Sequence, residues 1–195
     1  MVRTFLVSGT NTVIIKMELE KIDSFYKQLF RKAGLTIAVI LVVAFVDIGL
    51  ISNIEYNWNV WMVFMLTVVK IFFIVHLSFS QLVKIISQSH LLSHVLVLFT
   101  LLIGLIIFSF ASDFAALHLI DDNNFKSNYD INSSIWTVFF EYFYLSIITF
   151  SSVGYGDIVP VSIVAKSTVI LEVGLRFFVL IFGIANVNQI KINQE

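Results

Sequence analysis

The sequence has too few charged residues for a soluble domain of its size. Only 13% of its 195 residues are charged and 58% are hydrophobic, and its mean hydropathy is +0.95. So few charged residues cannot cover a water-exposed surface, so we expect the outer surface to face lipid. We therefore expect an integral protein of the plasma (cytoplasmic) membrane.

Cysteine is absent and proline occurs once. Without cysteine there can be no disulfide scaffold, thiolate zinc site or cysteine nucleophile. The net charge of −1 gives no indication of a nucleic-acid partner. The HExxH and GxSxG motifs are absent too, as is a paired acid–base set on one helical face. These absences argue against an enzyme, and nothing indicates an organic cofactor.

Long apolar runs dominate the sequence instead. Four of them, at about 33–54, 58–83, 89–117 and 161–187, exceed the roughly 20 residues that a helix needs to cross a bilayer. Lysine and arginine precede the first run and follow the second and fourth, which places them on one side of the membrane if there are four spans. The positive-inside rule then predicts that both termini are cytosolic.

A fifth apolar stretch, at about 135–150, is too short to span the bilayer. Its helical part of about 13 residues would extend about 20 Å and then run into the glycine-rich stretch TFSSVGYGDIVP, residues 149–160. A half-length helix followed by irregular backbone is tolerated at membrane depth only inside protein or beside a water-filled cavity. The sequence therefore predicts an all-α membrane protein with four transmembrane helices plus a re-entrant pore helix and loop.

Residues 17–32 are expected to form an amphipathic helix on the membrane surface, because apolar residues recur there at helical spacing among charged ones. The alternative is a helix packed on a cytosolic partner.

The expected organisation has four parts. The parts are a cytosolic segment at 1–32, two peripheral helices at 33–88, a pore domain at 89–190 and a tail at 191–195.

The segment SVGYG, residues 152–156, is suited to coordinating a dehydrated cation. Potassium must exchange its water for oxygens of similar energy, and successive backbone carbonyls can supply them if they face one axis. Gly154 and Gly156 reach the backbone angles that this requires, Ser152 adds a hydroxyl at the inner end, and Val153 and Tyr155 would pack behind the ribbon. Because one chain supplies one row of oxygens, fourfold closure predicts a homotetramer.

The segment from Thr149 to Asp157, TFSSVGYGD, resembles the signature of the tetrameric potassium-channel family. The stretch YLSIIT at 144–149 is similar to that family's pore helix, and DIVP at 157–160 to its pore exit. The resemblance covers about half of the chain, from the third apolar run through the fourth. It implies a selectivity filter of Ser152, Val153, Gly154, Tyr155 and Gly156, the first four of which coordinate K⁺.

The same resemblance implies residues that support the filter. Tyr144 and Asp157 match a pair that is hydrogen-bonded behind the filter, and Thr149 and Ser151 would brace it. The chain departs from the family at the innermost filter position, where Ser152 replaces the usual threonine. We expect K⁺ selectivity to persist, with an inner ion site that differs from that of the family.

The fourth run departs from the family as well. Ungapped counting from the filter puts Arg176 where the family often has a hinge glycine, with Gly174 and Gly183 nearby, so hinge-based gating is left open. One face of this run would line the lower pore and could gate it by dewetting. The residues expected on that face are Phe177, Leu180, Ile181 and Ile184.

Charged residues within the apolar runs are expected to pair, since an unpaired charge in the bilayer is costly. Glu172 and Arg176 stand four residues apart, which allows a salt bridge within one helix. The alternative is an arginine near the cavity that tunes conductance or gating. Asp47 and Lys70 could join the two peripheral helices, which lack the repeated basic residues of a voltage sensor.

These features favour passive conduction of K⁺ ions by a homotetramer in the lipid bilayer. A weakly selective cation channel, suggested by Ser152, and a non-conducting regulatory membrane subunit remain alternatives. His90 and His94 lie one turn apart, and we expect interfacial histidines there rather than a metal site or pH switch.

Overall fold

The structure of the protein is a computed structural model, and it describes residues 34, 37–44, 46, 56–78, 92–127 and 134–192. The chain divides into two compact units, Met1–Thr36 and Ile37–Glu195, and the fold below is that of the second. The expected surface helix at 17–32, most of the first apolar run and His90 lie outside the described residues.

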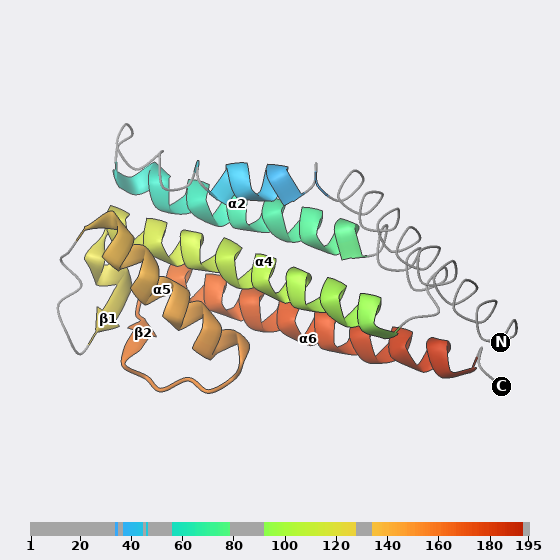
Figure 1. The fold of residues 1–195 in the computed structure, drawn as a ribbon. Helices are drawn as coiled ribbons and strands as arrows, with labels where there is room; N and C mark the ends of the chain where they lie inside the picture. The colour runs from blue at the N-terminus through green and yellow to red at the C-terminus, as the bar shows by residue number, and fades with distance from the viewer. Residues whose placement is uncertain are drawn as a thin grey trace, which may run out of the picture. The chain divides into compact units, whose positions relative to one another are not determined.

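Helices make up most of the described chain, and Figure 1 shows their arrangement. Two short strands pair antiparallel with Phe125 opposite Pro160 and Ser127 opposite Ile158. The elements are α2 (Tyr56–Leu77), α4 (Leu92–Ile120), the 3₁₀ turn η2 (Asp122–Asn124), β1 (Phe125–Ser127), α5 (Ile135–Phe150), β2 (Ile158–Pro160) and α6 (Ile163–Ile192).

Two described helices are long and apolar enough to cross a membrane, over Val60–Leu77 in α2 and Phe99–Ile120 in α4. The first lies within the second predicted span, at about 58–83, and the second overlaps the third, at about 89–117. Helix α5 has 16 residues, or about 24 Å, which is less than the roughly 30 Å of a hydrocarbon core. Helix α6 has 30 residues but carries three charged side chains in its first half.

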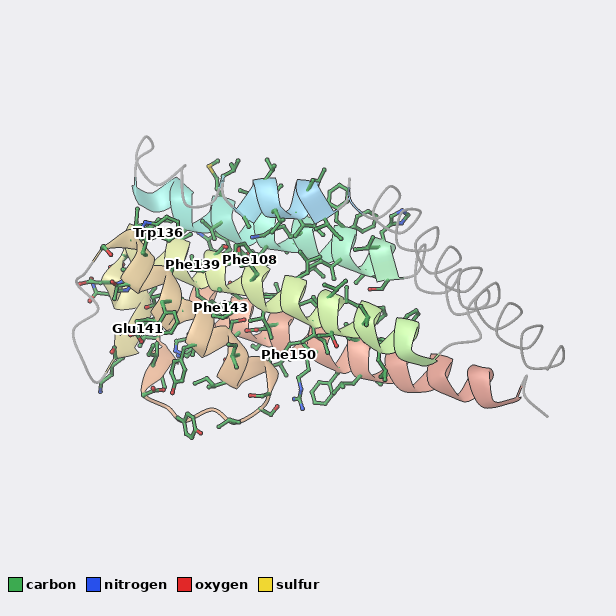
Figure 2. All side chains as sticks on the ribbon, in the orientation of Figure 1. Phe108, Trp136, Phe139, Glu141, Phe143 and Phe150 are labelled. Atoms are coloured by element: carbon green, nitrogen blue, oxygen red, sulfur yellow. The ribbon has the colours of Figure 1, made fainter. Side chains whose placement is uncertain are left out.

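Helix α4 is the centre of the pore region because it packs against α2, α5 and α6. Residues 109–117 are all buried, and this segment alternates phenylalanine with serine and alanine. Small residues allow neighbouring helices to approach closely. Figure 2 shows the contact with α5, where Phe108 lies against Phe139 with ring centroids 5.3 Å apart.

The chain after α4 is tied to the chain that precedes α6. The buried Asn124 donates from its side chain to the Leu117 carbonyl at 2.8 Å, while its own carbonyl accepts from the Val161 N–H at 2.9 Å. The β1–β2 pairing continues this connection along Phe125–Ser127. The exit of the glycine loop is therefore anchored to the C-terminal end of α4.

Candidate ion-binding site

The last turn of α5 holds the entry to the glycine loop, residues 152–156. The Val153 and Gly154 N–H groups both donate to the Ile148 carbonyl, at 2.9 and 3.2 Å, and the Ser152 N–H donates to the Thr149 carbonyl at 3.0 Å. A helix end normally leaves such carbonyls without partners. Here they fix the first half of the loop by taking up its N–H groups.

Backbone angles in the loop alternate. Ser152, Gly154 and Gly156 have φ values of 61°, 54° and 75°, whereas Val153 and Tyr155 have no positive φ. Positive φ at every second residue is a backbone pattern that allows successive carbonyls to face one side. Glycine adopts positive φ without strain, but Ser152 does so at a cost.

The carbonyl oxygens of residues 152–155 accept no hydrogen bond from any residue that the structure describes. Residues 152–155 are exposed, so these four oxygens are open to water or to a cation. Such oxygens are the ligands that hard monovalent cations accept in place of water.

The outer end of the loop is held by the pair implied by the family resemblance. The Tyr144 hydroxyl donates to Asp157 Oδ2 at 2.7 Å, and the Ile158 N–H donates to Oδ1 of the same carboxylate at 3.1 Å. The hydrogen bond to Asp157 raises the pKa of Tyr144 to about 12, so the phenol keeps its proton and remains the donor. Asp157 thus connects α5 to the start of β2.

At the start of the glycine loop, the backbone of α5 contributes more of the contacts that hold the loop than side chains do. Thr149 contributes its carbonyl, as described above, and the Ser151 hydroxyl donates to the Ile147 carbonyl at 2.7 Å.

The expected salt bridge between Glu172 and Arg176 is wrong. The Arg176 guanidinium donates to the Ser152 hydroxyl and lies over the Phe177 ring, 5.1 Å from its centroid. Glu172 is fully buried and contacts Ser146 instead. The spacing permits a salt bridge, but each side chain meets a partner outside α6 instead, on α5 for Glu172 and in the loop for Arg176.

Glu172 forms a buried link between three helices. Its Oε1 lies 2.5 Å from the Ser146 hydroxyl of α5, and that hydroxyl also lies 3.0 Å from the Ile107 carbonyl of α4. A hydroxyl has one hydrogen to donate. Ser146 therefore shares this hydrogen between Glu172 Oε1 and the Ile107 carbonyl, and so joins α5 to both α6 and α4.

Lys70 of α2 forms a buried ion pair with Asp113 of α4; their side chains are 1% and 0% exposed. The predicted partner of Lys70, Asp47, lies outside the described residues. A charged pair at membrane depth is stable only when both members are neutralised by contacts. The pair therefore joins the peripheral helix α2 to the centre of the pore region.

Helix α6 continues through both glycines that were considered as hinges. Gly183 has a packing role, since a Cβ atom built there would lie 3.1 Å from the Phe99 ring of α4. The expected pore-lining residues Phe177, Leu180 and Ile181 are 53%, 42% and 67% exposed. The side chain of Ile184 lies outside the described set.

Comparison with known protein families matches residues 95–191 to a family described as ion channel. The match begins in α4, includes α5 and the glycine loop, and ends in α6. The channel region of this chain belongs to that family. It is a family of membrane channels and not of enzymes. No curated protein and no solved structure matches the chain.

Sequence reasoning missed three residues that organise the channel. Asp113 is the one charged residue of the run at 89–117 and Ser146 lies in the stretch at 135–150, and only their neighbours in space reveal a partner. Asn124 lies between these two stretches, and its role depends on Leu117 and Val161. A charged residue within an apolar run is the signal that could have identified Asp113.

Proposed function

We propose that the channel conducts potassium ions passively through a filter made of residues 152–156. The observation that supports this proposal is the row of carbonyls of residues 152–155, to which no described donor is hydrogen-bonded and which the alternating sign of φ allows to face one side. These carbonyl oxygens would replace the water of a K⁺ ion, whereas the Ser152 hydroxyl accepts from Arg176. Asp157, Tyr144, Thr149 and Ser151 would hold the filter at its two ends.

We propose a homotetramer, because a single chain leaves the filter incomplete. Val153 and Tyr155 are 51% and 72% exposed, so the packing behind the ribbon that the filter needs must come from a neighbouring subunit. The exposed apolar face of α6 supports the same assembly, with Phe177, Leu180, Ile181 and Ile184 lining the cavity beneath the filter. A closed ring of four supplies four rows of oxygens around one axis.

The proposed subunit has four transmembrane helices, with α5 and the filter re-entrant and both termini cytosolic, in the cytoplasmic membrane. The length of α5 supports a re-entrant role. Its C-terminal end would then place its negative dipole towards the cavity, which favours a cation there.

Reversal potentials test this function most directly. The purified protein is placed in planar bilayers with KCl on one side and NaCl on the other, and the potential of zero current is measured. A K⁺-selective pore gives a reversal potential near the K⁺ equilibrium potential. Gly156→Ala should abolish selectivity or current, because alanine at φ 75° is strained by about 1–2 kcal/mol in each subunit. Gly104→Ala is the matched control, since this α4 glycine has open space around it.

The alternatives give different results. A reversal potential near zero in the wild type would indicate a weakly selective cation channel. No current from a correctly assembled protein would indicate a non-conducting subunit. Unchanged selectivity in Gly156→Ala would contradict the carbonyl filter itself.

A further inference from the structure

Arg176 places a positive charge at the inner end of the glycine loop. Its guanidinium donates to the hydroxyl of Ser152, the first residue of the loop, and its position is further defined by the Phe177 ring. In the part of the chain that the structure describes, no carboxylate forms a salt bridge with Arg176. The guanidinium carries one positive charge.

We propose that Arg176, held by Ser152, makes the channel an inward rectifier by lowering the concentration of cations at the cytosolic mouth of the filter. The proposal rests on the proposed function, because it concerns the direction in which that filter conducts best. Outward current draws its ions from the inner mouth, whereas inward current draws them from the outer side. A positive charge at the inner mouth therefore reduces outward current more than inward current.

The expected size follows from Coulomb's law. If the four arginines are taken to lie about 10 Å from the axis in water, with a Debye length of about 8 Å at ~0.15 M salt, the local cation concentration falls about twofold. At ~1 M salt the Debye length is about 3 Å, so the same charges have almost no effect. The ratio of outward to inward current should therefore rise towards one as salt is raised.

Ser152 explains why the arginine is held here. Its backbone is in the left-handed region at φ 61°, a conformation that a residue other than glycine keeps only when its surroundings hold it. The Arg176 contact holds its side chain, and the Thr149 carbonyl holds its N–H. Arg176 is thus a positioning residue for the inner filter as well as the source of the field.

Three variants of the full chain separate charge from hydrogen bonding. Unitary currents are recorded in symmetrical KCl at ~0.15 M and ~1 M. Arg176→Gln keeps an amide donor for Ser152 and removes the charge, so the outward-to-inward ratio should rise about twofold at the lower salt. Arg176→Lys keeps the charge and should retain rectification. Lys166→Gln is the matched control, because this exposed lysine lies ten residues nearer the outer end of α6 and should leave outward current unchanged.

Several results would overturn the proposal. One is an unchanged current ratio in Arg176→Gln with K⁺ selectivity intact. Another is wild-type rectification that does not weaken between the two salt concentrations, a measurement that needs no variant. A wild type that carries no K⁺-selective current would refute the proposed function first. A selective wild type with a symmetrical current would refute only the role of Arg176.

Discussion

Replacing Lys70 with methionine should strongly destabilise the channel, although the residue lies far along the chain from the glycine loop. Lys70 and Asp113 are paired at the α2–α4 contact and are 1% and 0% exposed. Methionine keeps an unbranched apolar stem, so little packing is lost. The carboxylate of Asp113 would lose the lysine charge while staying buried, which typically costs about 3–5 kcal/mol.

The loss can be measured as the unfolding midpoint of the purified protein in mild detergent. At about 2–4 °C per kcal/mol for a chain of this size, the midpoint should fall by about 6–20 °C. The double variant Lys70→Met/Asp113→Leu removes both charges and should recover to near the wild-type midpoint, because a buried pair is often no more stable than apolar residues of similar volume. Val69→Met, on the exposed face of α2, is the control and should change stability by less than about 0.5 kcal/mol.

Two results would refute this reasoning. The first is a midpoint for Lys70→Met within about 2 °C of the wild type, equivalent to less than about 1 kcal/mol. The second is a double variant whose midpoint falls by the sum of the falls in Lys70→Met alone and Asp113→Leu alone, since partners in one contact must show coupling.

Three further substitutions test other contacts. Glu172→Gln should stay near the wild-type midpoint because its amide oxygen still accepts from Ser146, whereas Glu172→Ala should cost about 2–3 kcal/mol; equal losses in both would contradict a role for this hydrogen bond. Tyr144→Phe removes the hydrogen bond to Asp157, worth about 1.5–3 kcal/mol, and K⁺ current should decay faster during sustained recording; a decay rate equal to the wild type would argue against an anchoring role. Asn124→Ala should lower the midpoint by an amount matching about 1–3 kcal/mol, and hydrogen exchange at the Val161 N–H should speed up; unchanged exchange would exclude the clamp.

The membrane class and the position of the short helix could be predicted from sequence because they depend on local quantities. Chain hydropathy is a property of consecutive residues, and α5 covers residues 135–150, the same stretch that was too short to span. The α4 and α6 ends differ from prediction by a few residues, as helix ends commonly do. The family resemblance pointed to the region that the family comparison matches, residues 95–191.

Pairing within the bilayer could not be read from spacing. Glu172 and Arg176 are correctly spaced for a salt bridge, yet Ser146 and Ser152 lie closer in space and take their contacts. The competing partners come from α5 and from the loop, 26 and 24 residues away in sequence. Spacing along one helix describes only that helix, and a packed bundle offers each polar group several other partners.

The sequence by itself determined that this chain belongs in lipid and that a glycine-punctuated loop follows a half-length helix. These features follow from hydropathy and from the backbone freedom of glycine, which are properties of the residues themselves. Only the tertiary structure decided that α4 is the central helix, that Asn124 anchors the loop exit, and that Arg176 sits at the inner end of the loop. Those outcomes depend on which side chains meet when separate segments pack, and no local pattern contains that information.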